Sequence, residues 1–199
     1  MSAFSNFAVS FTIISILSGC LTLYATGMST GGPTVIVWGW LVVGVLTLFV
    51  GLAMAEVCSA YPTAGGLYFW AAQLARKNTA AWATFTGYDA SAHMIEETKN
   101  AAKAGPRGIA MSIVISLVAG WVLLVGLTFA IQDYDGGLHS ATGVPPAQIF
   151  IDAAGRSLGL ILLVIVVVAQ LFRGLASVAA NSRMIFAFSR DGALPGSRL

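Results

Sequence analysis

Charged side chains are scarce in this sequence, and their scarcity excludes most soluble architectures. Only 9% of the 199 residues are Asp, Glu, Lys or Arg, whereas 57% are hydrophobic. The mean hydropathy is +0.85. In soluble globular proteins about a quarter of the residues are charged, so this composition indicates an integral membrane protein whose first partner is the lipid bilayer.

The residues that nucleic-acid, disulfide and catalytic sites require are also few. The net charge of +2 comes from scattered cations without a long basic run, so no nucleic-acid partner is expected. Cys20 and Cys58 lie in or at the end of apolar runs, which is not the spacing of a disulfide framework or a zinc site. His93 and His139 are the only histidines, so few imidazole bases are available for nucleophilic catalysis. We therefore expect no enzyme, no metal and no cofactor.

Long apolar runs are what the sequence does contain. About 20 helical residues cross the roughly 30 Å hydrocarbon core of a bilayer. Four segments meet this requirement, namely 9–27, 35–56, 109–131 and 158–172, the last continuing less purely to about residue 180. Each must be helical, because a lone strand in lipid leaves its backbone groups without partners. The sequence predicts one all-α membrane domain over residues 1–199, with about four full transmembrane helices plus interfacial or broken helices.

Basic residues orient these helices, because Lys and Arg are enriched in cytoplasmic loops. The loops after the first and third predicted spans contain neither residue type. Both types flank the middle region, and arginines follow the fourth span; Arg156 is the exception. We expect a multi-pass protein of the plasma or inner membrane with both termini in the cytoplasm.

Two polar interruptions stand out in the apolar chain. In the first span, Ser18 and Gly19 permit local unwinding of the helix. Gly19 could equally allow another helix to pack closely. A third alternative is a bacterial lipobox, whose form the residues LSGC at 17–20 have. The second interruption, FTGYDASAHMIEETK at 85–99, reads either as a helix broken at Thr86 and Gly87 or as a wet face with a surface ion pair before a turn at GPRG, 105–108.

Several motifs together carry a family resemblance. SILSGC, AMAEVCSAYPTAGGLYFW, FTGYDASAHMIEETK and ANSRMIFAFSRDG resemble the amino acid-polyamine-organocation superfamily, most closely its amino acid/choline and GABA permease branch. The resemblance implies transport of amino acids or related amines, linked to H⁺ or another ion or to exchange. It also implies an inverted-repeat fold in which broken first and sixth helices hold the substrate.

The resemblance also implies site residues. Matching the two helix breaks gives the substrate-binding candidates Ser18, Gly19, Cys20, Phe85, Thr86, Gly87 and Tyr88. Asp89 and Glu56 match positions with a coupling or structural role.

One departure from the family pattern is large. Residues 1–83 resemble the first two helices and the start of the third, whereas 84–199 resemble the second half of the sixth helix through the eighth. The intervening helices have no counterpart, so the chain looks like a truncated, internally deleted fragment that is not autonomous. The alternative is a small integral-membrane interaction protein without transport activity, which could form a homo-oligomer.

Arg173 is the second departure, because it follows a fifteen-residue apolar run in the fourth span. An unpaired Arg near the bilayer centre costs about 2.5–3.5 kcal/mol on insertion scales. Arg173 is either a coupling or substrate-path charge, paired with Asp89, or a variant in a chain that has lost its function.

Overall fold

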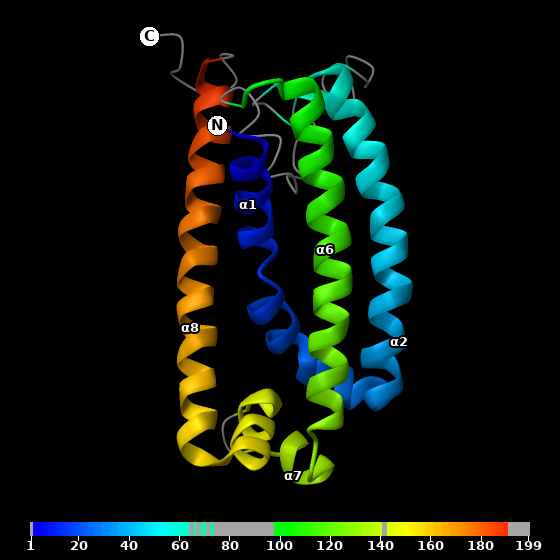
Figure 1. Cartoon of the computed structure of the whole chain (residues 1–199), viewed down its shortest axis with the longest axis vertical. Coiled ribbons are helices and arrows are strands. Elements are labelled where there is room, and N and C mark those ends of the chain that lie inside the picture. The colour runs from blue at the N-terminus through cyan, green and yellow to red at the C-terminus, as the bar shows by residue number, and fades with distance from the viewer. Residues whose placement is uncertain are drawn as a thin grey trace. The chain divides into compact units, whose positions relative to one another are not determined.

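The structure is a computed structural model of the chain, and it describes residues 2–63, 66, 69, 70, 73, 98–140 and 143–190. Within those residues the regular elements are all helices (Figure 1), which confirms the predicted all-α class. They are α1 (Ala3–Ile14), α2 (Ile16–Ala60), α6 (Ala101–Phe129), α7 (Tyr134–Leu138) and α8 (Pro145–Arg190).

Three helical stretches of the described residues are long and apolar enough to cross a membrane: Phe4–Ala60, Ala101–Phe129 and Pro145–Ala187. The first has 57 residues, which at 1.5 Å per residue greatly exceeds one bilayer crossing. Gly32, with φ 65° and ψ −156°, interrupts it. The first two predicted spans therefore lie on either side of Gly32, in one helical stretch.

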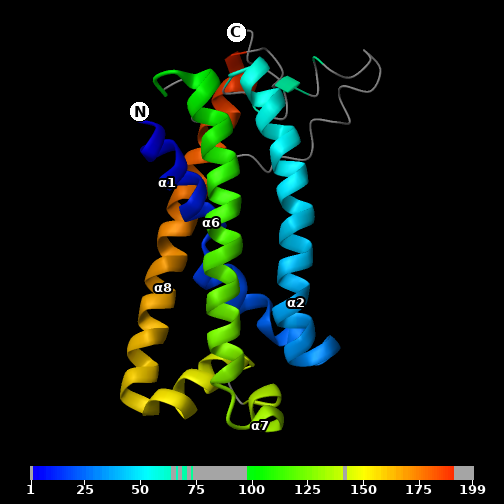
Figure 2. The ribbon, with the colours of Figure 1, turned by 45° about the vertical axis from the view of Figure 1, so that its right-hand side comes forward.

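Helix α8 is likewise divided, because Gly155 has φ 78° and ψ 162°. Figures 1 and 2 show the short yellow segment before this glycine meeting the long helix after it at a sharp turn. The fourth predicted span lies wholly in the part after Gly155, which continues as helix to Arg190. Proline residues at 145 and 146 begin the short segment, in the first turn, where a missing N–H is tolerated.

The predicted turn at GPRG is wrong, because α6 begins at Ala101 and contains Pro106. The helix continues through this proline at the loss of one backbone hydrogen bond. Packing against α1 explains why glycine follows: a Cβ on Gly108 would lie 2.8 Å from Asn6 Oδ1. Asn6 is fully buried and its Nδ2 donates to Thr98 Oγ1 at 3.2 Å, so the contacts of α1 select the helical conformation here.

The chain forms two compact units. Unit 1 comprises Met1–Ile13, Leu48–Ile113 and Gly174–Leu199, and its core cluster is Ala55, Cys58, Trp70 and Ile109. The buried Trp70 indole donates from Nε1 to the Tyr61 carbonyl oxygen at 2.8 Å, which satisfies its only polar group.

Unit 2 comprises Ile14–Thr47 and Val114–Arg173. Its core joins α2 to α6, α7 and α8 through Cys20, Leu21, Tyr24, Met28, Ile36, Leu124, Leu127 and Ile149. Side-chain hydrogen bonds also join α2 to α6. Tyr24 Oη lies 2.9 Å from Thr128 Oγ1, and Trp40 Nε1 donates to the Leu117 carbonyl oxygen at 2.9 Å. Unit 2 contains the first of the two predicted helix breaks.

Candidate functional site

The first predicted span is broken at Ser15, between the end of α1 at Ile14 and the start of α2 at Ile16 (Figure 1). Ser15 has φ 43°, a left-handed conformation that is uncommon for residues other than glycine. Its carbonyl oxygen accepts the first bond of α2, from Gly19 N at 2.8 Å. The three amides before Gly19, on residues 16–18, consequently have no acceptor within the helix.

The predicted position of this break is therefore wrong by three residues, because Ser18, Gly19 and Cys20 all lie inside α2. Side-chain hydrogen bonding favours the earlier position. The Ser18 hydroxyl donates to Ser15 Oγ at 2.9 Å, which links the residue at the break to the first turn of α2. Ser15 thus belongs to the candidate site, and the sequence analysis missed it; the Ser-x-x-Ser spacing was the available signal.

Gly19 lies close to the end of α1. A Cβ at this position would lie 3.3 Å from the Ile14 carbonyl oxygen. This oxygen is at the end of α1, where carbonyl groups lack an i+4 donor within the helix. Cys20 instead points into the core of unit 2 and is 5% exposed. Of the three predicted residues in the first helix, Ser18 and Gly19 border the break and Cys20 packs the core behind it.

Arg173 of α8 meets this break. Its Nη1 donates to Ser18 Oγ at 3.3 Å, and Ser18 is only 1% exposed. Two residues singled out separately in the sequence, 155 positions apart, are therefore neighbours. Among the residues that the structure describes, no carboxylate forms an ion pair with Arg173.

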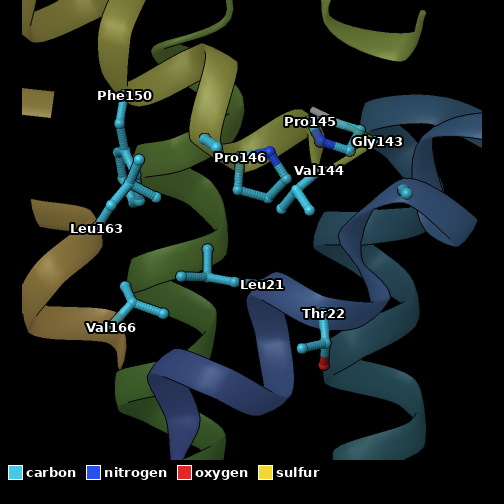
Figure 3. Close-up of a pocket in the computed structure, with 11 residues that line it drawn as sticks. Leu21, Thr22, Gly143, Val144, Pro145, Pro146, Phe150, Leu163 and Val166 are labelled. Carbon is cyan, nitrogen blue, oxygen red and sulfur yellow. The ribbon is translucent and has the colours of Figure 1, made fainter. Parts of the chain in front are cut away.

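An apolar pocket lies further along the same two helices (Figure 3). It has a volume of about 200 Å³. Its lining comes from α2, the 143–146 segment and α8, and comprises Leu21, Thr22, Ala25, Gly143, Val144, Pro145, Pro146, Ala147, Phe150, Leu163 and Val166. Leu21 follows Ser18 by about one turn and Val166 precedes Arg173 by about two, so the polar break and the apolar pocket share one helix pair.

The remaining predicted site residues do not join this group in the described part of the chain. Phe85, Thr86, Gly87, Tyr88 and Asp89 lie outside the described residues. Glu56 is exposed on α2 and belongs to unit 1.

Comparison with known proteins places the chain in a family. The model of the amino acid permease family matches residues 2–83 and 79–199, two segments that meet beside the predicted junction near residues 82–85. The amino-acid permease BAT1 homolog of Oryza sativa subsp. japonica is 32% identical over 338 positions, covering 98% of this chain and 65% of the relative. Amino-acid permease BAT1 of Arabidopsis thaliana is 30% identical, covering 100% and 66%.

A GABA-specific permease of Saccharomyces cerevisiae is 22% identical, with 99% of this chain and 58% of the relative covered. The chain therefore spans about two thirds or less of the length of these three curated relatives. The 338 aligned positions exceed the 199 residues of the chain, so the rice relative has residues within the aligned region that this chain lacks. No solved structure matches. The match over nearly all residues shows that this chain is a membrane protein of the amino acid permease family.

Proposed function

We propose that this chain takes part in the transmembrane transport of amino acids or related amines and does not transport by itself. The observation that carries the proposal is the helix break at Ser15 inside an apolar stretch long enough to cross a membrane. Unpaired backbone groups within a membrane-spanning segment are tolerated where they line a cavity or bind a solute. Membership of a permease family supports the same interpretation.

The break at Ser15 gives the substrate a defined orientation in this proposal. The amides at the start of α2 and the Ser18 hydroxyl receive a carboxylate, because a helix N-terminus favours negative charge. Gly19 allows the close approach, and Cys20 shapes the wall of the site. Residues 85–88 supply the second break, which receives the ammonium group, and Asp89 and Glu56 brace the structure or couple transport to H⁺ or another ion.

The lack of independent transport follows from the missing residues. Alternating access in inverted-repeat transporters moves one helical bundle against another. The rice relative has residues within the aligned region that this chain lacks, and we propose that the gap lies at residues 82–85. We propose that the missing helices are those between the third and the sixth, so that one repeat is incomplete. The chain then acts in the plasma or inner membrane beside a fuller copy or in a homo-oligomer.

Substrate counterflow in proteoliposomes tests the proposal. The chain alone should show no saturable uptake of labelled amino acids or GABA. A chimera that carries, between Ala83 and Thr84, the segment that the rice relative has in the gap should show uptake that Gly87→Leu abolishes. Saturable uptake by the 199-residue chain would contradict the claim of dependence. An inactive but folded chimera would contradict participation in transport and leave an interaction protein as the better description.

A further inference from the structure

Arg173 is a cation with an incomplete set of partners at the polar break of unit 2. It lies in the part of α8 that is long and apolar enough to cross a membrane. Its guanidinium has five N–H donors, of which the described residues engage one, through Nη1 and Ser18 Oγ. A charged residue at such a position is costly unless it faces a polar partner, and it marks a functional site more often than not.

The partner that suits this arrangement is a carboxylate. Guanidinium presents paired donors in a planar fork that matches the two oxygens of a carboxylate, which lysine cannot do. Serine is a neutral partner and leaves the positive charge uncompensated. The described acidic residues, Glu56, Asp133, Asp135 and Asp152, form no ion pair with Arg173.

The Ser18 contact also fixes where the free donors lie. Ser18 is in the first turn of α2, where the amides of residues 16–18 lack acceptors within the helix. Ser18 is 1% exposed and its hydroxyl donates to Ser15 Oγ at 2.9 Å, so the side chain that accepts from Arg173 is fixed in the first turn of α2. Two kinds of anion-binding donor, from helices α2 and α8, therefore converge on the same break.

We propose that Arg173 binds the carboxylate of the transported solute and thereby restricts the substrate to carboxylate-bearing amines. This inference rests on the proposed transport function and names its substrate class. Amino acids, including those whose amine is distant from the carboxylate, satisfy the site. Choline and polyamines, which carry only positive charge, are repelled by Arg173.

Binding to the purified full chain in lipid nanodiscs tests the inference, with isothermal titration calorimetry as the measurement. Three probes share a four-carbon chain: GABA, butyrate without the amine, and butylamine without the carboxylate. Wild-type protein should bind GABA and butyrate but not butylamine. Arg173→Gln should weaken binding of GABA and butyrate at least about tenfold, and Arg173→Lys should be intermediate because it keeps the charge and loses the fork.

Arg156→Gln is the matched control, because Arg156 is an exposed arginine at the start of the long part of α8. It should leave all affinities within about twofold. Circular dichroism and size-exclusion chromatography establish that each variant is folded, and Arg173→Lys serves as the folded test if Arg173→Gln is not.

The outcomes separate this inference from the transport proposal. Failure of wild-type protein to bind butyrate, or wild-type affinity for GABA and butyrate in both Arg173→Gln and Arg173→Lys, would overturn the inference. Butyrate binding that appears only in Asp89→Asn would also overturn it, by showing that Asp89 already occupies Arg173. Carboxylate binding that depends on Arg173, together with a chimera that shows no uptake, would support the inference while the transport proposal fails.

Discussion

The Tyr134 hydroxyl donates a hydrogen bond of 2.6 Å to the Met28 carbonyl oxygen. Met28 lies in the last turn before Gly32, where helix carbonyls lose their i+4 partners. Tyr134 begins α7, which Asp133 caps by accepting from Gly136 N at 3.0 Å. A short helix between two spans thus stabilises the point at which α2 changes direction.

Tyr134→Phe should destabilise unit 2 by about 1 kcal/mol, because it leaves a partly buried carbonyl without its donor. Unfolding by SDS titration in mixed micelles, followed by circular dichroism, measures the loss. Tyr61→Phe is the control, since no hydrogen bond of the Tyr61 hydroxyl occurs within the described residues. Equal effects of the two substitutions would show that the Met28 contact contributes nothing specific.

Gly32→Ala should destabilise the chain by about 1–3 kcal/mol, because φ 65° with ψ −156° is a region open almost only to glycine. The added Cβ would also lie 3.2 Å from Tyr134 Oη. Gly39→Ala, inside the helix after the kink, meets only Val35 Cγ1 at 3.8 Å and should be neutral or stabilising. The same SDS titration compares the two variants, and a neutral Gly32→Ala would contradict the strain argument.

Gly120→Ala should destabilise the α2–α6 contact of unit 2 by about 1–3 kcal/mol through overpacking. Its Cβ would overlap the Trp40 indole, whose Nε1 already donates to the Leu117 carbonyl oxygen. Gly126→Ala on the same helix meets nothing within 4 Å and should gain a few tenths of a kcal/mol from helix propensity. Tryptophan fluorescence during unfolding measures the stability of both variants. A stabilising Gly120→Ala would contradict the close packing of Trp40 against Gly120.

Gly19→Leu and Gly87→Leu should each abolish amino acid binding in a chain that carries the missing helices. At Gly19 a side chain crowds the Ile14 carbonyl oxygen, where the ligand-facing backbone begins. Gly87 lies outside the described residues, so its role is predicted from the sequence alone. Gly174→Leu is the control, with nothing within 4 Å of its Cβ. Calorimetry measures the affinity. Wild-type affinity in both test variants would show that Gly19 and Gly87 serve helix packing and not ligand binding.

The Lys and Arg distribution predicts that segments 27–33 and 132–144 face the outside. Cysteines placed at Ser29 and His139, both exposed in the structure, should react with a membrane-impermeant maleimide in intact cells. A cysteine at Lys103, also exposed, should react only after permeabilisation. A background with Cys20 and Cys58 replaced removes competing labelling, and external reaction at Lys103 would reverse the proposed orientation.

Helical spans were predictable from the sequence because the cost of unpaired backbone in lipid leaves apolar runs few alternatives. The breaks were less predictable, since they depend on single residues. Ser15 adopts a positive φ that serine rarely takes, whereas Ser18 and Gly19, the more evident candidates, are helical. The contact between Arg173 and Ser18 was beyond reach for a different reason: nothing in either local sequence indicates which face of α8 meets α2.

The turn expected at GPRG shows how tertiary packing overrides a local signal. Pro106 and two glycines usually end a helix, yet α6 runs through them where Gly108 admits Asn6 of α1. In the candidate site, the residue types were recognised in Ser18, Gly19 and Arg173, but the pocket lined by Phe150 and Leu163 was not. Its lining is ordinary apolar helix surface, and the pocket forms only where α2 and α8 bring these residues together.

The two cysteines of the sequence are thiols outside any disulfide, and each compact unit holds one of them. Cys58 is 0% exposed in unit 1 and Cys20 is 5% exposed in unit 2. A thiol so shielded reacts with an alkylating reagent only when its surroundings open, so the modification rate at each cysteine records the opening free energy of its own unit. The wild-type chain therefore contains one natural reporter in each unit. Alkylation of Cys58 and of Cys20 would measure the local opening of units 1 and 2 in a bilayer without engineered cysteines.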